Sequence, residues 1–171
     1  SRFDLSLDYG AIEEPYKPTL RGATPVFDEA GTRRGIVLLN YLGSALLNRL
    51  RQVSQAYGGN LALVDHEGYW LLGERPDDAW GFMLNRPDAT LASRYPEGWK
   101  RMVAQGNGVF DDRTGYWSFA HFDPHERSDE SGELEGRWML VSHLPYEQIQ
   151  GVRFEVIWQV LLFVCVMLTL G

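Results

Sequence analysis

The stretch LRGATPVFDEAGTRRGIVLLNYLG, residues 20–43, decides the fold class of this chain of 171 residues. Two runs rich in apolar and β-branched residues, 20–27 and 34–41, flank the turn sequence DEAG at 28–31. The glycine of that turn can adopt the positive φ that tight turns require. The pattern therefore predicts a β-hairpin.

The rest of the chain adds helices and two more hairpins. Apolar residues recur at helical spacing between positions 46 and 57, and two glycines follow that should end the helix. Hairpins are expected at 60–73 and 108–122, and a last strand at 137–144. A loop-rich stretch with a short helix (74–103) and a polar connector (123–136) lie between them. Short strands joined mostly by hairpins predict an α+β fold with an antiparallel sheet and flanking helices.

The end of the chain, residues 156–171, carries no formal charge, and Gln159 is its only strongly polar side chain. Each Leu, Ile, Phe or Val contributes roughly −0.3 to −0.6 kcal/mol to membrane insertion, so about ten of them outweigh the glutamine. The alternative is a buried C-terminal helix, but residues 160–170 lack the polar face of a surface helix. We therefore expect an exit helix, 146–171, that continues into a membrane-spanning segment shortened by the end of the sequence.

Composition and motifs exclude several classes of function. The net charge of −7 and the absence of a basic stripe argue against nucleic acid as a partner. The single cysteine, Cys165, lies in the apolar run, so the rest of the chain has no disulfide framework. There is also no glycine-rich phosphate loop and no GxSxG nucleophile motif. The sequence therefore predicts a domain without catalytic activity and without a cofactor.

One short stretch, HFDPHE at 121–126, offers His121, Asp123 and His125 as metal ligands. Metal ligands need a rigid frame with supporting hydrogen bonds. Pro124 and the polar loop that follows it break that frame, so we expect no metal site. A membrane-anchored enzyme, for instance a hydrolase that uses His121 and an acidic neighbour, is a further alternative.

Aromatic and arginine side chains concentrate in the middle of the chain. Aromatic rings with polar tips wall small-ligand pockets, and an arginine fork binds a carboxylate. The candidate ligand-binding residues are Trp80, Arg94, Tyr95, Trp99, Tyr69 and Tyr116. The alternative is that these rings form a core beneath a long loop, which is the interpretation we favour for Trp70 and Trp117.

Four stretches together resemble a known family: the hairpin at 20–43, LVDHEGYWLLG (63–73), DDAWGFML (77–84) and RYPEGW (94–99). They are similar to the PDC/Cache extracytoplasmic sensor domains of bacterial receptors. The likeness is greatest to the membrane-proximal half of double Cache sensors on diguanylate cyclases and histidine kinases. It implies a PAS-like antiparallel sheet of five or six strands. The ligand clasp of amino-acid-binding Cache domains is not recognisable, so the identity of the ligand stays open.

The resemblance also implies an organisation and a function. Residues 1–19 look like a connector from an upstream half, 20–145 like the sensor domain, and 146–171 like the exit helix. The implied protein is a receptor of the inner membrane whose sensor domain lies in the periplasm or extracellular space. That domain would bind a small polar or carboxylate-bearing molecule. The alternative is a ligand-free spacer and dimerisation module that relays a signal from the upstream half.

The expected exit helix carries a candidate dimer seam. Ile149, Val152, Val156 and Gln159 fall at spacings of three and four, which predicts a parallel homodimer through this helix. A glutamine inside the bilayer gains a hydrogen-bond partner from its twin across the two-fold axis. A ligand could then act by shifting one helix against the other. The alternative is that Ile149 and Val152 only pack on their own sheet.

Overall fold

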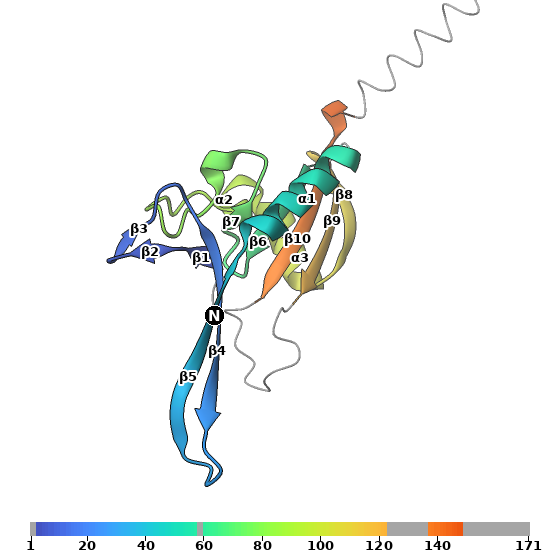
Figure 1. Ribbon diagram of the computed structural model, residues 1–171. Coiled ribbons are helices and arrows are strands. Elements are labelled where there is room, and N and C mark those ends of the chain that lie inside the picture. The colour runs from blue at the N-terminus through green and yellow to red at the C-terminus, as the bar shows by residue number, and fades with distance from the viewer. Residues whose placement is uncertain (1–2, 58–59, 123–136, 149–171) are drawn as a thin grey trace, which may run out of the picture.

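A five-stranded antiparallel sheet forms the centre of the computed structural model, which describes residues 3–57, 60–122 and 137–148 (Figure 1). In spatial order its strands are β7 (Trp70–Leu72), β6 (Asn60–Asp65), β10 (Trp138–Pro145), β9 (Gly115–Phe122) and β8 (Gly108–Asp112). The first and last strands of this sheet in sequence, β6 and β10, therefore pair at its middle. The predicted α+β class and antiparallel sheet are confirmed.

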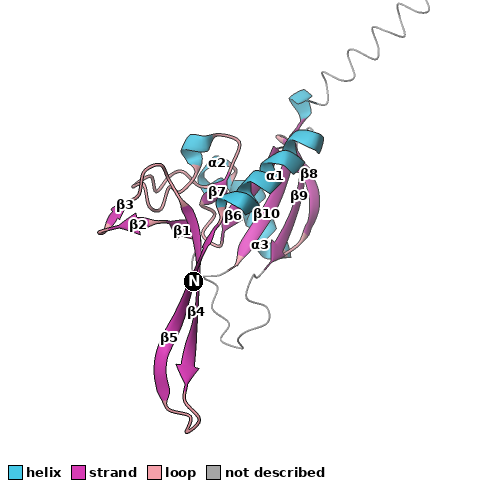
Figure 2. Cartoon of the chain, in the orientation of Figure 1, coloured by secondary structure: helices cyan, strands magenta, loops and turns pink. Residues whose placement is uncertain are grey.

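Helices cover both faces of this sheet, because alternate side chains of its central strands point to opposite sides. On one face α1 (Ser44–Tyr57) packs through Leu47 against Leu63 of β6. On the other face α2 (Leu91–Arg94) and α3 (Pro96–Gln105) pack against Val64 and Val141. Figure 2 shows α1 lying across the sheet. Each face thus has a hydrophobic core of its own.

The N-terminal stretch, which we expected as a connector, is packed into the first of these cores. Its three short strands are β1 (Asp4–Leu5), β2 (Leu7–Asp8) and β3 (Ala11–Ile12). Phe3 and Leu5 are fully buried beside α1. The stretch therefore contributes to the stability of the domain.

The hairpin expected at 20–43 is confirmed as β4 (Pro18–Phe27) and β5 (Arg33–Leu42). The side chain of Asp28 closes its turn by accepting hydrogen bonds from the N–H groups of Ala30 and Thr32. This hairpin does not join the central sheet. It pairs with β1 at its base and projects away from the rest of the fold (Figure 1).

A single residue, Gly43, separates the end of β5 from the start of α1. A Cβ atom at Gly43 would overlap with the ring of Phe3. The N–H of Gly43 also donates to the carbonyl oxygen of Pro18, at 2.8 Å. The junction between hairpin and helix is therefore short and closely packed.

The other two expected hairpins are confirmed as β6–β7 and β8–β9. In the first, the carboxylate of Asp65 accepts the N–H groups of Glu67 and Tyr69, and Gly68 has a φ of +86°. A 3-10 turn, η1 (Pro76–Asp78), then begins the loop that leads from β7 to α2. These turns position the residues that line the candidate site.

The predicted exit helix beyond Gln148, with Ile149, Val152, Val156 and Gln159, lies outside the described residues. Within the ranges that the structure describes, we find no helix whose length and apolar character would allow it to cross a membrane.

Trp80, which we expected at a ligand site, lies in the core on the α1 face. It is 5 % exposed, and its ring meets that of Phe3 edge to face at 5.2 Å. We predict that Trp80→Ala lowers the free energy of unfolding by about 3–5 kcal/mol, as for other buried aromatic residues. Urea denaturation measures this change.

The matched control is Tyr9→Ala, because Tyr9 is also an aromatic residue with positive φ but is fully exposed. This control should change the free energy of unfolding by less than about 0.5 kcal/mol. Equal effects at the two positions would contradict the assignment of Trp80 to the core.

Candidate functional site

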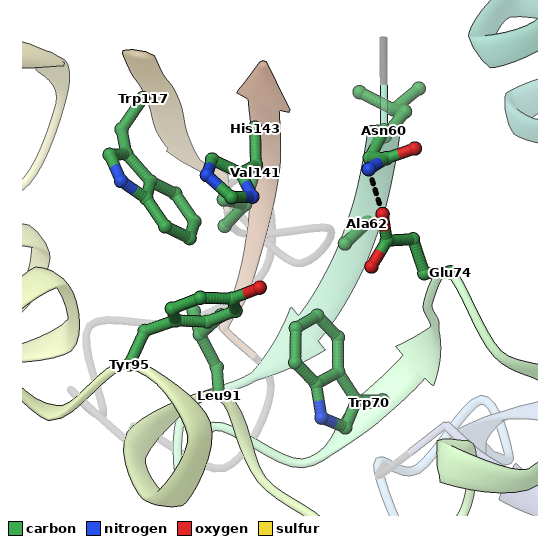
Figure 3. Close-up of a pocket in the computed structure, with 10 residues that line it drawn as sticks. Asn60, Ala62, Trp70, Glu74, Leu91, Tyr95, Trp117, Val141 and His143 are labelled. Carbon is green, nitrogen blue, oxygen red and sulfur yellow. Dashed lines mark hydrogen bonds between the residues drawn. The ribbon is translucent and has the colours of Figure 1, made fainter. Parts of the chain in front are cut away.

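A pocket lies between the central sheet and the α2–α3 segment (Figure 3). It is lined by the aliphatic residues Leu61, Ala62, Leu91 and Val141 and by the polar or aromatic residues Asn60, Trp70, Glu74, Tyr95, Trp117 and His143. About 310 Å³ of unoccupied space includes its open mouth, but only about 20 Å³ accommodates the centre of a water molecule. The closed part of the pocket therefore holds roughly one water.

The register of the sheet brings the pocket residues together. In the β6–β10 ladder, Asn60 lies opposite His143, and Ala62 lies opposite Val141. In the β10–β9 ladder, Trp117 lies on the other side of His143. Because residues two apart in a strand share a face, these side chains all point to the α2–α3 side.

Three rings form the inner wall. The rings of Trp117 and His143 are stacked, with centroids 3.8 Å apart and planes 10° from parallel. The ring of Tyr95 meets both edge to face, at 4.8 Å from Trp117 and 5.3 Å from His143. Figure 3 shows the phenol of Tyr95 reaching across the pocket between these rings and Trp70. Tyr95 is thus the residue that closes the pocket.

Burial sets the protonation of the two titratable rings. Burial lowers the pKa of His143 and outweighs the opposing effects of the Thr114 carbonyl, Glu74 and Asp112. Since Nε2 of the imidazole lies 3.3 Å from the carbonyl oxygen of Thr114, Nε2 carries the proton and Nδ1 is an acceptor. Burial, followed by the charge of Glu74, raises the pKa of Tyr95, so its phenol stays protonated.

The mouth of the pocket is polar. Glu74 follows β7 and is exposed, and one of its carboxylate oxygens accepts a hydrogen bond from the amide of Asn60 (Figure 3). This carboxylate and Nδ1 of His143 are hydrogen-bond acceptors, and the protonated hydroxyl of Tyr95 can both donate and accept. Such a set complements a molecule that presents N–H or O–H donors.

An ion-pair network holds the η1 segment against α2. Asp78 is 9 % exposed and accepts from Arg94 at 2.7 Å and from Arg75 at 3.0 Å. Burial of Asp78 opposes its ionisation, but the hydrogen bonds from the two arginines prevail and lower its pKa. Arg94 also lies over the ring of Trp70, 5.3 Å from its centroid. The network therefore fixes both Trp70 and the segment that carries Glu74.

Of the six residues predicted to bind a ligand, Tyr95 lines this pocket. Arg94 is engaged by Asp78 and faces an outer groove that Arg101 and Arg113 also line. Trp80 lies on the opposite face of the sheet. The three others are Trp99, which packs on the core beside Gly68; Tyr69, which pairs with Phe82; and Tyr116, which is half-exposed beside Tyr146.

Sequence reasoning did not select Asn60, Glu74 or His143, and it assigned Trp70 and Trp117 to the core. Both tryptophans are indeed in the core on this face, and they also line the pocket. The signal that could have found His143 and Asn60 is strand alternation, because each lies two residues from an apolar residue that faces the helices. Their juxtaposition also needed the pairing of β6 with β10, which the sequence did not predict.

Among the residues that the structure describes, no three His, Cys, Asp or Glu side chains are grouped so as to hold a metal ion. His121 contacts the carbonyl oxygen of Gly106 through Nδ1. Asp123 and His125, the other two candidate ligands, lie outside the described residues.

The Asp78 network gives a pH-dependent prediction. Because the pKa of Asp78 is lower in the folded than in the unfolded state, its ionised form stabilises the fold above the unfolded pKa. That contribution is lost as the pH falls through the folded pKa. Asp78→Asn should therefore lower the free energy of unfolding at pH 7 by about 1–3 kcal/mol.

The difference between wild type and Asp78→Asn should shrink below about pH 4, where the wild-type carboxylate also becomes protonated. Urea denaturation at several pH values measures it. The neighbouring exposed residue supplies the control, since Asp77→Asn should show no such dependence. A constant difference between pH 7 and pH 3 would contradict the role of the ion pair.

Comparison with known proteins identifies the family. A family model described as "Bacterial histidine kinase, sensor domain" matches residues 2–131, which is more than half of the chain. Among curated proteins, the comparison finds no match.

Solved structures share the fold. The extracellular domain of vpHK1S-Z8, assigned to the histidine kinases, has a TM-score of 0.72 and 22% identity over 90% of this chain and 52% of its own. The domain of a sensory box/GGDEF family protein from Vibrio parahaemolyticus has a TM-score of 0.67 and 20% identity. The match covers 86% of this chain and 52% of that domain. The periplasmic sensory domain of the Campylobacter jejuni chemoreceptor Tlp1 has a TM-score of 0.60 and 14% identity. The match covers 87% of this chain and 49% of that domain.

This chain thus spans about half the length of the solved domains that it matches. The matches agree with the resemblance to PDC/Cache sensors, since the neighbours are sensory domains of a histidine kinase, a GGDEF protein and a chemoreceptor. On the match of the family model, the chain belongs to the sensor domains of bacterial histidine kinases.

Proposed function

We propose that this chain senses a small polar molecule outside the cytoplasm, as the sensor domain of a membrane-bound bacterial signalling receptor. The observation that carries the proposal is the aromatic-walled pocket on the α2–α3 face, with polar groups from four separate segments converging on it. An apolar cavity with a few convergent polar groups is the usual form of a small-ligand site.

The polar groups of the pocket favour a ligand with an amine or hydroxyl group. Glu74, Tyr95 and Nδ1 of His143 offer acceptors for such a group. Arg94, the expected carboxylate fork, is occupied by Asp78. A carboxylate on the ligand would therefore have to bind elsewhere in the pocket or remain in solvent.

Tyr95 would have to move when a ligand enters, because the closed part of the pocket has room for roughly one water. Tyr95 lies between α2 and α3 and is their shared cap residue. A rotation of its side chain would open the space between Trp70 and Trp117. This would couple occupation of the pocket to the position of the two helices.

The small free volume also favours a second candidate function, a spacer and dimerisation module that binds no ligand. In that case the rings of the pocket serve only as core. The same binding experiment separates the two functions.

We predict that a panel of small amines, amino alcohols, amino acids and dicarboxylates contains a compound that raises the thermal unfolding temperature of the protein. For that compound, Glu74→Gln and Tyr95→Phe should each weaken binding about tenfold or more, as expected for loss of one hydrogen bond to a ligand. Calorimetric titration measures the affinities.

Glu97→Gln is the matched control, because Glu97 is an exposed glutamate that lines the outer groove and not the pocket. Loss of affinity at Glu97 with none at Glu74 would move the site to the outer groove. No stabilisation by any compound of the panel would favour the spacer function.

The output of the sensor would leave through the segment after β10. β10 lies at the middle of the sheet and ends at Pro145, and His143 of the pocket is two residues before that end. A movement in the pocket would therefore act directly on the start of the exit helix. We propose that this helix anchors the domain in the inner membrane and pairs with its twin in a parallel homodimer.

The proposed seam predicts a pattern of disulfide cross-links in membranes that hold the complete polypeptide. With Cys165 replaced by Ala, single cysteines at Val152, Val156 and Gln159 should cross-link readily, because they share one helix face. Cysteines at Phe154 and Trp158 should cross-link poorly. Equal cross-linking at all five positions would mean that no fixed seam exists.

A further inference from the structure

His143 is a buried histidine near the end of the central strand β10. Its side chain is 8 % exposed, and its ring is stacked on that of Trp117, with centroids 3.8 Å apart. It lies two residues before β10 ends at Pro145. Because the ordinary pKa of histidine is roughly 6.5, its charge responds to pH in the physiological range. A change of charge at this ring would occur between the pocket and the point where the chain leaves the sheet.

The groups around the imidazole determine when it takes up a proton. Among the described residues, the charged or titratable groups on the elements packed against it are Glu74, Asp112, Tyr95, and Asp78 with its partners Arg75 and Arg94. The carboxylates of Glu74 and Asp112 favour the imidazolium, but burial outweighs them and lowers the pKa of His143. The imidazole is therefore neutral at pH 7 and takes up a proton when its surroundings become acidic.

Protonation converts Nδ1 of His143 from an acceptor to a donor, and a buried donor without an acceptor is costly. Asp112 is already fixed by hydrogen bonds within its own turn and from Trp117. Glu74 is exposed and accepts from Asn60, which lies opposite His143 in the β6–β10 ladder. Figure 3 shows the imidazole between Trp117 and the side of the pocket where Asn60 and Glu74 lie. Glu74 is therefore the carboxylate available to the new donor.

The same proton also acts on the other nitrogen of the ring. Nε2 lies 3.3 Å from the carbonyl oxygen of Thr114, which is long for a hydrogen bond. A charged donor makes a shorter and stronger bond. Thr114 lies in the β8–β9 turn, and the next residue, Gly115, pairs with Pro145. A Cβ atom at Gly115 would overlap with the carbonyl oxygen of Leu144. A pull on Thr114 would therefore act directly on the end of β10.

We propose that the proton is itself a signal for this domain and that His143 senses it. At neutral pH, Glu74 binds the amide of Asn60. On acidification, a proton from solvent adds to Nδ1, and the imidazolium then binds Glu74 at Nδ1 and Thr114 at Nε2. No other bond is made or broken covalently. This function is independent of a small-molecule ligand, because the closed part of the pocket holds roughly one water and a proton needs no free volume.

NMR titration of the imidazole rings in the folded protein tests proton uptake, with His143→Gln to assign the signal. The ring of His143 should titrate below the ordinary value of roughly 6.5 while the fold is intact. Glu74→Gln should move this midpoint to still lower pH, because the carboxylate favours the imidazolium. Glu97→Gln is the matched control and should leave it unchanged, since Glu97 is an exposed glutamate of the outer groove.

Two other signals test whether the proton moves the protein. The side-chain amide signals of Asn60 should change with the midpoint of His143, because Glu74 leaves. The backbone amide signal of Gly115 should change with them, because it shares a peptide bond with the carbonyl group of Thr114. Both steps should be absent in His143→Gln.

Proton uptake by His143 only as the protein unfolds would overturn the proposal. Titration of His143 with the Asn60 signals unchanged would also overturn it, because Glu74 would then have kept its partner. Neither experiment includes a small-molecule ligand, so a negative result here leaves the proposed ligand-sensing function to its own test.

Discussion

The pairing of β6 with β10 is the constraint on which the rest of the structure depends. These strands are the first and last of the central sheet in sequence, and their register sets Leu63 opposite Leu140 and Ala62 opposite Val141. The first pair faces α1 and the second faces α3, so one ladder divides the protein into two cores. A slip by one residue would exchange the two faces along the whole strand. The pocket exists because this register also brings Asn60 to His143.

Local patterns predicted the elements of the fold well, because each hairpin has its own turn chemistry. Asp28, Asp65 and Asp112 each accept backbone N–H groups in the turns that the sequence indicated. Strand order was beyond such patterns, since β10 returns between β6 and β9 after a long connection. The sequence likewise did not distinguish the β4–β5 hairpin from the hairpins of the central sheet, because each of them consists of two β-rich runs joined by a turn sequence.

The site was harder to predict than the fold, for a physical reason that Arg94 and Trp80 illustrate. Residue type indicates what a side chain could bind, but it does not indicate which group of the protein that side chain contacts in the folded state. Arg94 meets the buried Asp78, and Trp80 turns at a positive φ into the core beside Phe3. Glu74 and His143 gave no motif at all, because their association depends on strand register and on the loop after β7. Tyr95, selected because it lies in a loop-rich stretch with many rings, lines the pocket.

Only Gly43 separates β5 from α1, so we expect the β4–β5 hairpin and α1 to move together. β5 is a rod of about 33 Å and α1 one of about 21 Å. The junction at Gly43 has little room to bend, because the ring of Phe3 fills the space beside it. A change in the tilt of the β4–β5 hairpin would therefore shift α1. Leu47 of α1 packs with Leu63 of β6, on the face of the sheet opposite the pocket. The packing of Phe3 against Gly43 therefore determines how closely the orientation of the β4–β5 hairpin follows that of α1.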